Sequence, residues 1–238
     1  GRCPKIPTSF PKSYKVNNYQ QFAQAMNSIK PGEAILIADG TYNWDTKVPT
    51  QTKYKKLPHR AILISKSGMR GKPIYILSEN LYGAKFPSAG FGFILDGAHI
   101  VVGGFDFNQP KVTIFAGTGP DNRVACNKFY RGASTVINTR NSLADRFEVD
   151  NNIIDDNVIQ ATQFARCNPT YLKTCKKNST GIHIHHNTWK NKASAGKNGH
   201  EAIMLGYGYD AYPNTVVSDN PDGMNMDAVI ENNLFDSW

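Results

Sequence analysis

A short pattern of apolar and polar positions recurs four times along the chain. It consists of an apolar residue, two variable residues, an asparagine, one variable residue and a second apolar residue. The four asparagines are Asn127, Asn152, Asn187 and Asn233, at intervals of 25, 35 and 46 residues. Short β-rich runs lie between them, at residues 135–137, 158–159 and 202–205. Repetition on this scale is typical of a solenoid in which each coil contributes strands and corners, and insertions lengthen some coils.

Asparagine suits the corners of such a solenoid for two reasons. Its side chain tolerates the left-handed backbone conformation that a sharp corner needs. Stacked amides can also hydrogen-bond to one another from coil to coil. Four unrelated turns in a β-sandwich are the alternative, but apolar residues flank all four asparagines in the same register. We therefore predict an all-β, right-handed, single-stranded parallel β-helix with the asparagines aligned along one axis.

The start of the chain predicts a cap for this β-helix. Residues 17–30 place apolar side chains at spacings of three and four, as a short amphipathic helix does. A proline–glycine stop follows, and then a buried strand at residues 34–38. Further strands are expected at residues 61–65, 73–78, 93–95, 100–102 and 112–115. No linker or low-complexity stretch interrupts the sequence, so we expect residues 1–238 to form one domain.

Composition and charge narrow the class of protein. With 40% hydrophobic and 19% charged residues, the chain has the composition of a folded globular protein and not of a disordered one. No apolar run approaches the roughly 18 residues of a membrane span. The net charge of +8 favours a polyanionic partner, although a basic protein can also be merely soluble. The basic residues are scattered and form no nucleic-acid-binding motif, so we favour an acidic polysaccharide over nucleic acid or a membrane.

The cysteines and one sequon indicate an oxidising, extracellular setting. No CxxC pair is present, and the cysteine spacing suits no zinc site. Cys167 and Cys175 bracket a polar loop, where we expect a local disulfide, and a glycosylation sequon follows at Asn178. The partners of Cys3 and Cys126 stay open. The chain begins without a charged and apolar leader, so we expect the secreted protein to be in its mature form here, with its signal removed.

Five strings match one family of enzymes in the family's own order. They are residues 22–42, GKPIYI at 71–76, IHHN at 184–187, NGHEAIMLG at 198–206 and ENNLF at 231–235. With them the chain resembles the polysaccharide lyases that include chondroitinase B and many alginate lyases, over nearly its whole length. The first string is shared with other β-helix proteins, whereas the last two together are considerably more specific.

The resemblance implies calcium-assisted β-elimination on a uronic-acid-containing glycan such as alginate, glucuronan or a glycosaminoglycan. A divalent cation on the uronate carboxylate would stabilise the enolate-like state that forms when the C5 proton leaves. Oxygen ligands suit calcium, a hard ion. Asn198 falls on the family's metal-binding asparagine, and Glu201 is a candidate partner that supports it.

The resemblance also implies that the chain holds only part of the site. The acidic ligands, the catalytic lysine and the catalytic arginine are expected beyond Trp238. We therefore expect a second polypeptide or a C-terminal part to complete the β-helix. A shortened form, or a natural relative that binds glycan without cutting it, is the alternative.

Candidate substrate contacts flank this region. They are His183, His185, Lys190, Lys192, Lys197 and Met204. Strand alternation places His183 and His185 on one face, where they could contact sugar, transfer protons or bind a metal, or could simply be solvated. The lysines could meet substrate carboxylates or be solvated. Met204 stands where the family usually carries arginine, which leaves the identity of the substrate open.

Two further function classes compete with the lyase. One is a non-catalytic β-helix that recognises acidic glycan. The other is a hydrolase that uses the carboxylates of Asp155 and Asp156. Neighbouring residues on a strand point apart, which disfavours the hydrolase.

Overall fold

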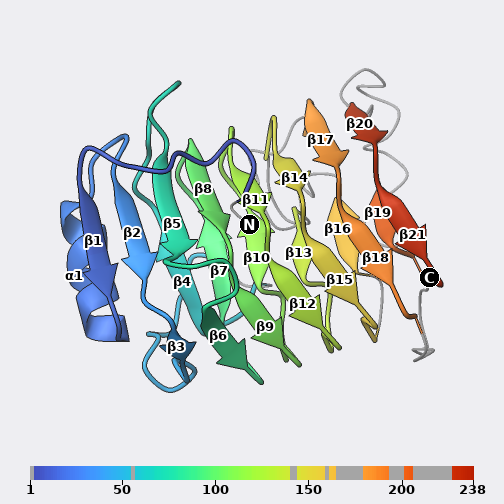
Figure 1. Ribbon diagram of the computed structural model, residues 1–238, viewed down its shortest axis with the longest axis horizontal. Coiled ribbons are helices and arrows are strands. Elements are labelled where there is room, and N and C mark those ends of the chain that lie inside the picture. Colours follow the sequence, from blue (N-terminus) through green and yellow to red (C-terminus); the bar gives the residue numbers. More distant parts are fainter. Residues whose placement is uncertain are drawn as a thin grey trace.

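The computed structural model describes residues 3–54, 57–139, 144–158, 161–164, 179–192, 201–205 and 227–238. In these ranges successive coils stack along one axis, so that their strands form three parallel sheets, and a helix covers the first coil (Figure 1). Each coil passes through the three sheets in turn. The predicted parallel β-helix with an N-terminal cap is therefore confirmed. None of the described helical segments is long and apolar enough to cross a lipid bilayer.

The strands fall into three sheets, named here in the order in which the chain visits them. Sheet 1 contains β1 (Ser13–Val16), β2 (Ala34–Ile37), β5 (Ile74–Ser78), β8 (Ile100–Gly103), β11 (Arg123–Ala125), β14 (Glu148–Asp150), β17 (Ile182–His185) and β20 (Ala228–Glu231). Sheet 2 contains β3 (Gly40–Thr41), β6 (Ala84–Pro87), β9 (Asp106–Asn108), β12 (Lys128–Tyr130), β15 (Ile153–Asp155), β18 (Thr188–Lys190) and β21 (Leu234–Asp236). Sheet 3 contains β4 (Ala61–Ile64), β7 (Gly92–Leu95), β10 (Phe115–Gly117), β13 (Ile137–Asn138), β16 (Thr162–Phe164) and β19 (Ile203–Leu205).

The cap is helix α1, which spans Tyr19–Ser28. Asn18 caps its N-terminus by accepting a hydrogen bond from the Gln21 backbone N–H at 2.9 Å. Phe22 is buried on the inner side of the helix, with its ring centroid 5.5 Å from that of Trp44. The predicted helix at residues 17–30 is thus confirmed and is two residues shorter at each end.

Aromatic side chains stack through the interior because corresponding inward positions recur in successive coils. The rings of Phe86, Phe107 and Phe129 are stacked, with centroid distances of 5.5 and 5.4 Å. All three side chains are fully buried. Each such contact contributes roughly 0.5–1.5 kcal/mol beyond the burial of its apolar area. The hydrophobic core therefore runs along the axis of the β-helix.

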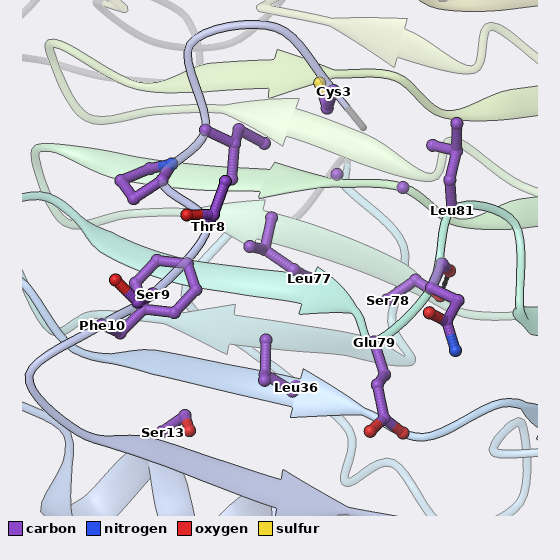
Figure 2. A pocket seen from close by; sticks show the side chains of 15 residues that line it. Cys3, Thr8, Ser9, Phe10, Ser13, Leu36, Leu77, Ser78, Glu79 and Leu81 are labelled. Carbon is purple, nitrogen blue, oxygen red and sulfur yellow. Dashed lines mark hydrogen bonds between the residues drawn. The ribbon is translucent and has the colours of Figure 1, made fainter. Parts of the chain in front are cut away.

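An N-terminal segment, residues 3–12, crosses the outer face of sheet 1 (Figure 1). Phe10 packs on Tyr75 with ring centroids 4.9 Å apart, and Ile6 joins the same apolar cluster. A pocket of about 650 Å³ lies beside this segment, with Leu36 and Leu77 in its lining (Figure 2). Its one acidic side chain, Glu79, forms an ion pair with Lys15. This lining has no basic side chain to pair with an acidic glycan, so we do not place the functional site there.

A disulfide between Cys3 and Cys126 fastens this segment to the β-helix. We expect Cys3→Ser to lower the free energy of unfolding by about 2–5 kcal/mol, because the bond closes a long loop and so restricts the unfolded chain. Urea unfolding with and without reductant measures the loss. Ser9→Ala, in the same segment, is the control and should change little. A Cys3→Ser protein as stable as the oxidised wild type would contradict the expectation.

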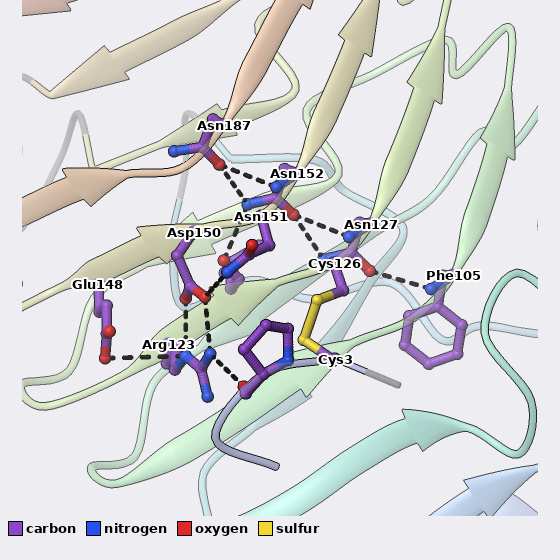
Figure 3. The surroundings of a disulfide bond; sticks show 12 residues. Cys3, Phe105, Arg123, Cys126, Asn127, Glu148, Asp150, Asn151, Asn152 and Asn187 are labelled. Atoms are coloured by element: carbon purple, nitrogen blue, oxygen red, sulfur yellow. Dashed lines mark hydrogen bonds and ion pairs between the residues drawn. A yellow bond between two sulfur atoms is a disulfide. The ribbon is translucent and has the colours of Figure 1, made fainter. Parts of the chain in front are cut away.

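The four repeated asparagines form a continuous ladder, of which Figure 3 shows Asn127, Asn152 and Asn187. The Asn127 side chain donates to Oδ1 of Asn152 at 3.1 Å, and Asn152 donates to Oδ1 of Asn187 at 3.0 Å. Asn187 continues the ladder to Asn233 at 3.1 Å. The side-chain oxygen of each later asparagine also accepts a hydrogen bond from the backbone N–H of the ladder asparagine in the preceding coil, at 2.9–3.0 Å. The predicted alignment along one axis is confirmed.

The predicted backbone reason for these asparagines is wrong. The left-handed residue at each corner is the one before the ladder position: Cys126 (φ 57°), Asn151 (φ 54°), His186 (φ 54°) and Asn232 (φ 53°). The ladder asparagines themselves turn inward, and the first three are almost fully buried. Asparagine is therefore required at these positions for the hydrogen bonds of its side-chain amide, and not because it tolerates a left-handed backbone.

Two predicted β-runs meet an observed strand at one residue each: the run at 112–115 overlaps β10 at Phe115, and the run at 135–137 overlaps β13 at Ile137. Of the run at 158–159, Val158 lies in no strand and residue 159 is outside the described ranges. Parallel pairing with the neighbouring coils fixes these short strands: Phe115 pairs with Phe93 and with Ile137. Local hydrophobicity does not record that pairing. The other predicted strands overlap observed ones.

Candidate functional site

The outer face of sheet 1 carries a block of polar side chains in two rows. Strand pairing places Arg123, Glu148 and His183 in one row. The second row, two residues further along each strand, contains Asp150, His185 and Glu231. The block lies beyond the apolar part of the face that the N-terminal segment covers. It is the densest group of titratable side chains in the described part of sheet 1.

An ion pair between Arg123 and Asp150 anchors this block (Figure 3). The guanidinium donates from Nε and Nη2 to the two carboxylate oxygens at 2.7 and 2.6 Å. The Asp150 side chain is fully buried and that of Arg123 is 9% exposed. Burial by itself would lower the pKa of Arg123, but its hydrogen bonds and charge interaction with Asp150 outweigh that effect and raise it. The guanidinium also donates to the Pro4 carbonyl at 2.8 Å, which ties it to the N-terminal segment.

Two histidines and two glutamates continue the block toward the last coil. His185 Nε2 lies 2.9 Å from Glu148 Oε1, and His183 Nε2 lies 2.9 Å from Glu231 Oε1. The two imidazole centroids are 4.0 Å apart, which confirms that both side chains occupy one face of β17. His186, at the corner, brings Nδ1 to 2.8 Å from Nδ1 of His185. Imidazole nitrogens and carboxylate oxygens therefore converge from three neighbouring strands.

Two of the lysines predicted as substrate contacts, Lys190 and Lys192, lie elsewhere. Lys190, in β18 of sheet 2, is 3.5 Å from Asp155. Lys192 donates to the Asn157 carbonyl, and its ammonium lies 5.0 Å from the ring centroid of Trp238. Burial lowers the pKa of Lys192, against the opposing charges of Asp156 and Glu201. Both lysines are thus engaged with the protein.

Met204 lies on a third side of the β-helix. It is in β19 of sheet 3, where Gln163 Nε2 approaches its sulfur at 3.4 Å. Strand pairing in sheet 3 places Gln163, Asn138 and Ala116 in the same row as Met204, one residue from each preceding coil. Glu201 is exposed just before β19. The structure therefore brings His183 and His185 together but does not place them beside Met204.

Other predicted site residues fall outside the described ranges. They are Asn198, Lys197, the Cys167–Cys175 pair and the sequon asparagine Asn178. The alternative carboxylate pair is described. Asp155 interacts with Lys190, and Asp156 lies 3.3 Å from Arg131. Each of these carboxylates has its own cation, which further disfavours a paired acid–base role.

Sequence reasoning missed four members of the sheet 1 block. They are Arg123, Glu148, Asp150 and Glu231. The signal was present, because each stands two or four residues before a ladder asparagine, at the same offsets as His183 and His185. Comparing the coils at these offsets, and not single motifs, would have found the block.

Comparisons with known proteins agree with the expected resemblance to polysaccharide lyases. No family model matches the chain. A pectate lyase L from Dickeya chrysanthemi is 27% identical over an alignment of 134 residues, and the match covers 52% of this chain and 30% of that enzyme.

Solved structures share the fold over most of the chain. The PL6 family alginate lyase AlyGC superposes with a TM-score of 0.70 and 18% identity, over 94% of this chain and 28% of that one. The PL6 family polysaccharide lyase Pedsa3628 from Pseudopedobacter saltans gives 0.65 and 17%, over 93% and 46%. The pectate lyase Pel9A gives 0.56 and 19%, over 87% and 57%. The β-helix fold is shared, and the chain spans less than two thirds of each of these proteins.

Proposed function

We propose that this β-helix acts in a polysaccharide lyase that cleaves a uronic-acid-containing glycan by calcium-assisted β-elimination. The observation that carries the proposal is the superposition of 94% of the chain on an alginate lyase. The resemblance of the strings at residues 198–206 and 231–235 to these lyases, in the family's order, also supports it. The net charge of +8 would concentrate an anionic polymer near the protein. We propose a secreted, extracellular setting, with which the Cys3–Cys126 disulfide is compatible.

The described residues do not by themselves provide a calcium site. Asn198, the proposed ligand, lies outside them. Among the described residues, the group that could hold a metal contains His183 and His185. Calcium prefers oxygen ligands, so two imidazoles make that group a poor calcium site. We therefore place the proposed calcium ion at Asn198 and derive no catalytic step through it.

Completion of the site requires further coils, which we propose to come from a C-terminal part or a second polypeptide. Strands β20 and β21 support this because their apolar side chains are open to solvent. Val229, Ile230, Leu234 and Phe235 are 43–57% exposed. Phe235 stacks on the buried Trp189 at 5.1 Å, as an aromatic residue of one coil stacks on the next. A further coil would cover this surface and supply the acidic ligands, the lysine and the arginine.

The test is an elimination assay on the complete protein with alginate, glucuronan and dermatan sulfate. We expect the ultraviolet absorbance of the unsaturated product to rise, to stop with chelator and to return with calcium. Asn198→Ala should reduce the rate by more than the roughly 10- to 100-fold that loss of a partner outside the ligand set causes. Asn108→Ala, an exposed residue at the end of β9, should leave the rate unchanged.

Other outcomes would overturn the lyase proposal. Glycan binding without any rise in absorbance would identify a binding protein. New reducing ends without absorbance would identify a hydrolase. An Asn198→Ala enzyme with the wild-type rate would show that Asn198 is not a calcium ligand.

A further inference from the structure

The histidine and glutamate side chains on the outer face of sheet 1 form a site of a different chemical kind. We propose that they bind one divalent transition-metal ion of the zinc type. The four ligands are Glu148, His183, His185 and Glu231, and we call them the sheet 1 metal site. It does not include Asn198 and does not depend on the lyase proposal.

The distances suit a compact ion. One imidazole nitrogen of His183, one of His185 and a carboxylate oxygen of Glu148 all lie within 4.8 Å of one another. Glu231 adds an oxygen 2.9 Å from His183 Nε2. A tetrahedral zinc ion with bonds near 2.0–2.2 Å holds its ligand atoms roughly 3.3–3.6 Å apart. Side-chain rotations would bring the ligand atoms of Glu148, His183 and His185 to that spacing, and Glu231 would supply the fourth ligand atom.

The ligand types select the metal. Neutral imidazole suits zinc, copper and nickel, whereas calcium and magnesium prefer oxygen alone. A set of two imidazoles and two carboxylates is therefore expected to prefer zinc to calcium.

The surroundings support ligation in two further ways. His185 Nδ1 lies 2.8 Å from Nδ1 of His186, so the second ring nitrogen of this ligand has a hydrogen-bonding partner that fixes the ring. The ligands come from β14, β17 and β20, three strands held in register by parallel pairing. A metal ion would thus tie three successive coils together.

The charge balance is also favourable. Two carboxylates with neutral imidazoles carry −2, which a divalent ion neutralises. The charge of Arg123 is already matched by the bidentate contact with Asp150. Lys5 competes with the ion, because its ammonium lies 3.7 Å from Glu148 Oε1. Arg123 Nε also lies 3.7 Å from Glu148 Oε2, but its guanidinium stays held by Asp150. The Lys5 side chain is 68% exposed and can move away when an ion binds.

The test is calorimetric titration of metal-free protein with Zn²⁺ alone, with Ca²⁺ as the comparison. We expect one equivalent of Zn²⁺ to bind and to raise the melting temperature, while Ca²⁺ at the same concentration does neither at this site. Co²⁺ in place of Zn²⁺ should give the visible absorption of a four-coordinate ion. Absence of stoichiometric Zn²⁺ binding would show that the block is only a network of ion pairs.

Variants separate this site from binding elsewhere. His183→Gln and Glu231→Gln should each weaken Zn²⁺ binding by at least about tenfold. His99→Asn is the matched control, since His99 also faces a carboxylate, that of Asp121 at 3.9 Å, but lies outside the site. Unchanged Zn²⁺ affinity in both ligand variants would overturn the proposal.

A second variant tests the site without removing a ligand. Lys5→Asn removes the competing cation and should tighten Zn²⁺ binding. Asparagine is chosen because residue 5 has a left-handed backbone (φ 59°), which asparagine adopts readily. Weaker binding in this variant would contradict the charge argument and the proposed location. This variant keeps the proposal testable even if a histidine variant fails to fold.

Discussion

Asn152→Ala is expected to lower the free energy of unfolding by about 3–5 kcal/mol, since each buried polar group left without a partner costs roughly 1–3 kcal/mol. The Asn152 side chain is buried and makes four of the ladder's hydrogen bonds. It accepts from the backbone and side chain of Asn127 at 2.9 and 3.1 Å, and donates to Val124 O at 2.9 Å and to Asn187 at 3.0 Å. Alanine replaces none of these groups, and water has little access. Urea unfolding of the two proteins gives the difference.

The control for this experiment is an asparagine outside the ladder. Asn108 is exposed at the end of β9, and Asn108→Ala should change the stability by no more than about 0.5 kcal/mol. Asn152→Asp is a second comparison, because it keeps the size but cannot donate to Asn187. Equal stability of Asn152→Ala and Asn108→Ala would mean that the ladder is a consequence of the fold and not one of its causes.

The ladder also explains why the fold was predictable. The spacing of its asparagines and flanking apolar residues is set by one coil geometry, and the sequence records it directly. The cap helix was predictable for a similar reason, since the apolar spacing of α1 is a local feature. The strand at Thr162–Phe164 was not, because it carries no apolar run of its own and depends on pairing with β13 and β19.

The candidate sites were predictable in part. Alternation correctly placed His183 and His185 together, because it is a property of a single strand. The partners Glu148 and Glu231 come from other coils, 37 and 48 residues away from the histidines they contact. A motif read along one strand carries no information about them. The same limit applies to the grouping of Met204 with His183, which strand assignment separates onto different sheets.

The outer face of sheet 1 changes character along the axis. At the first coils it is apolar, with Tyr75, Leu77 and Val101 packed against the N-terminal segment. From β11 onward most of the equivalent positions hold charged side chains or histidines, with Ala125 and Val229 as the exceptions. The change occurs where the segment is tied down, at the Cys3–Cys126 disulfide and at the hydrogen bond from Arg123 to Pro4. Arg123 therefore joins the covered half of this face to the polar half.

That position gives Arg123→Ala the second large expected effect. The substitution leaves the fully buried carboxylate of Asp150 without its cation, which typically costs about 3–5 kcal/mol. It also removes the donor to Pro4, so the N-terminal segment should become more accessible to protease near residue 4. Chemical unfolding measures the first effect, and mass spectrometry of limited digests locates the second.

A double variant distinguishes loss of the pair from loss of packing. In Arg123→Met combined with Asp150→Leu, both charges are replaced by apolar groups of similar volume, so no buried charge remains uncompensated. We expect the double variant to recover most of the stability that either single variant loses, since replacing a whole buried pair is often neutral. The digest pattern should not recover, because methionine cannot donate to Pro4. If the losses from the two single variants simply add, the carboxylate and the guanidinium are not coupled. The contact at 2.6 Å would then contribute to geometry and not to stability.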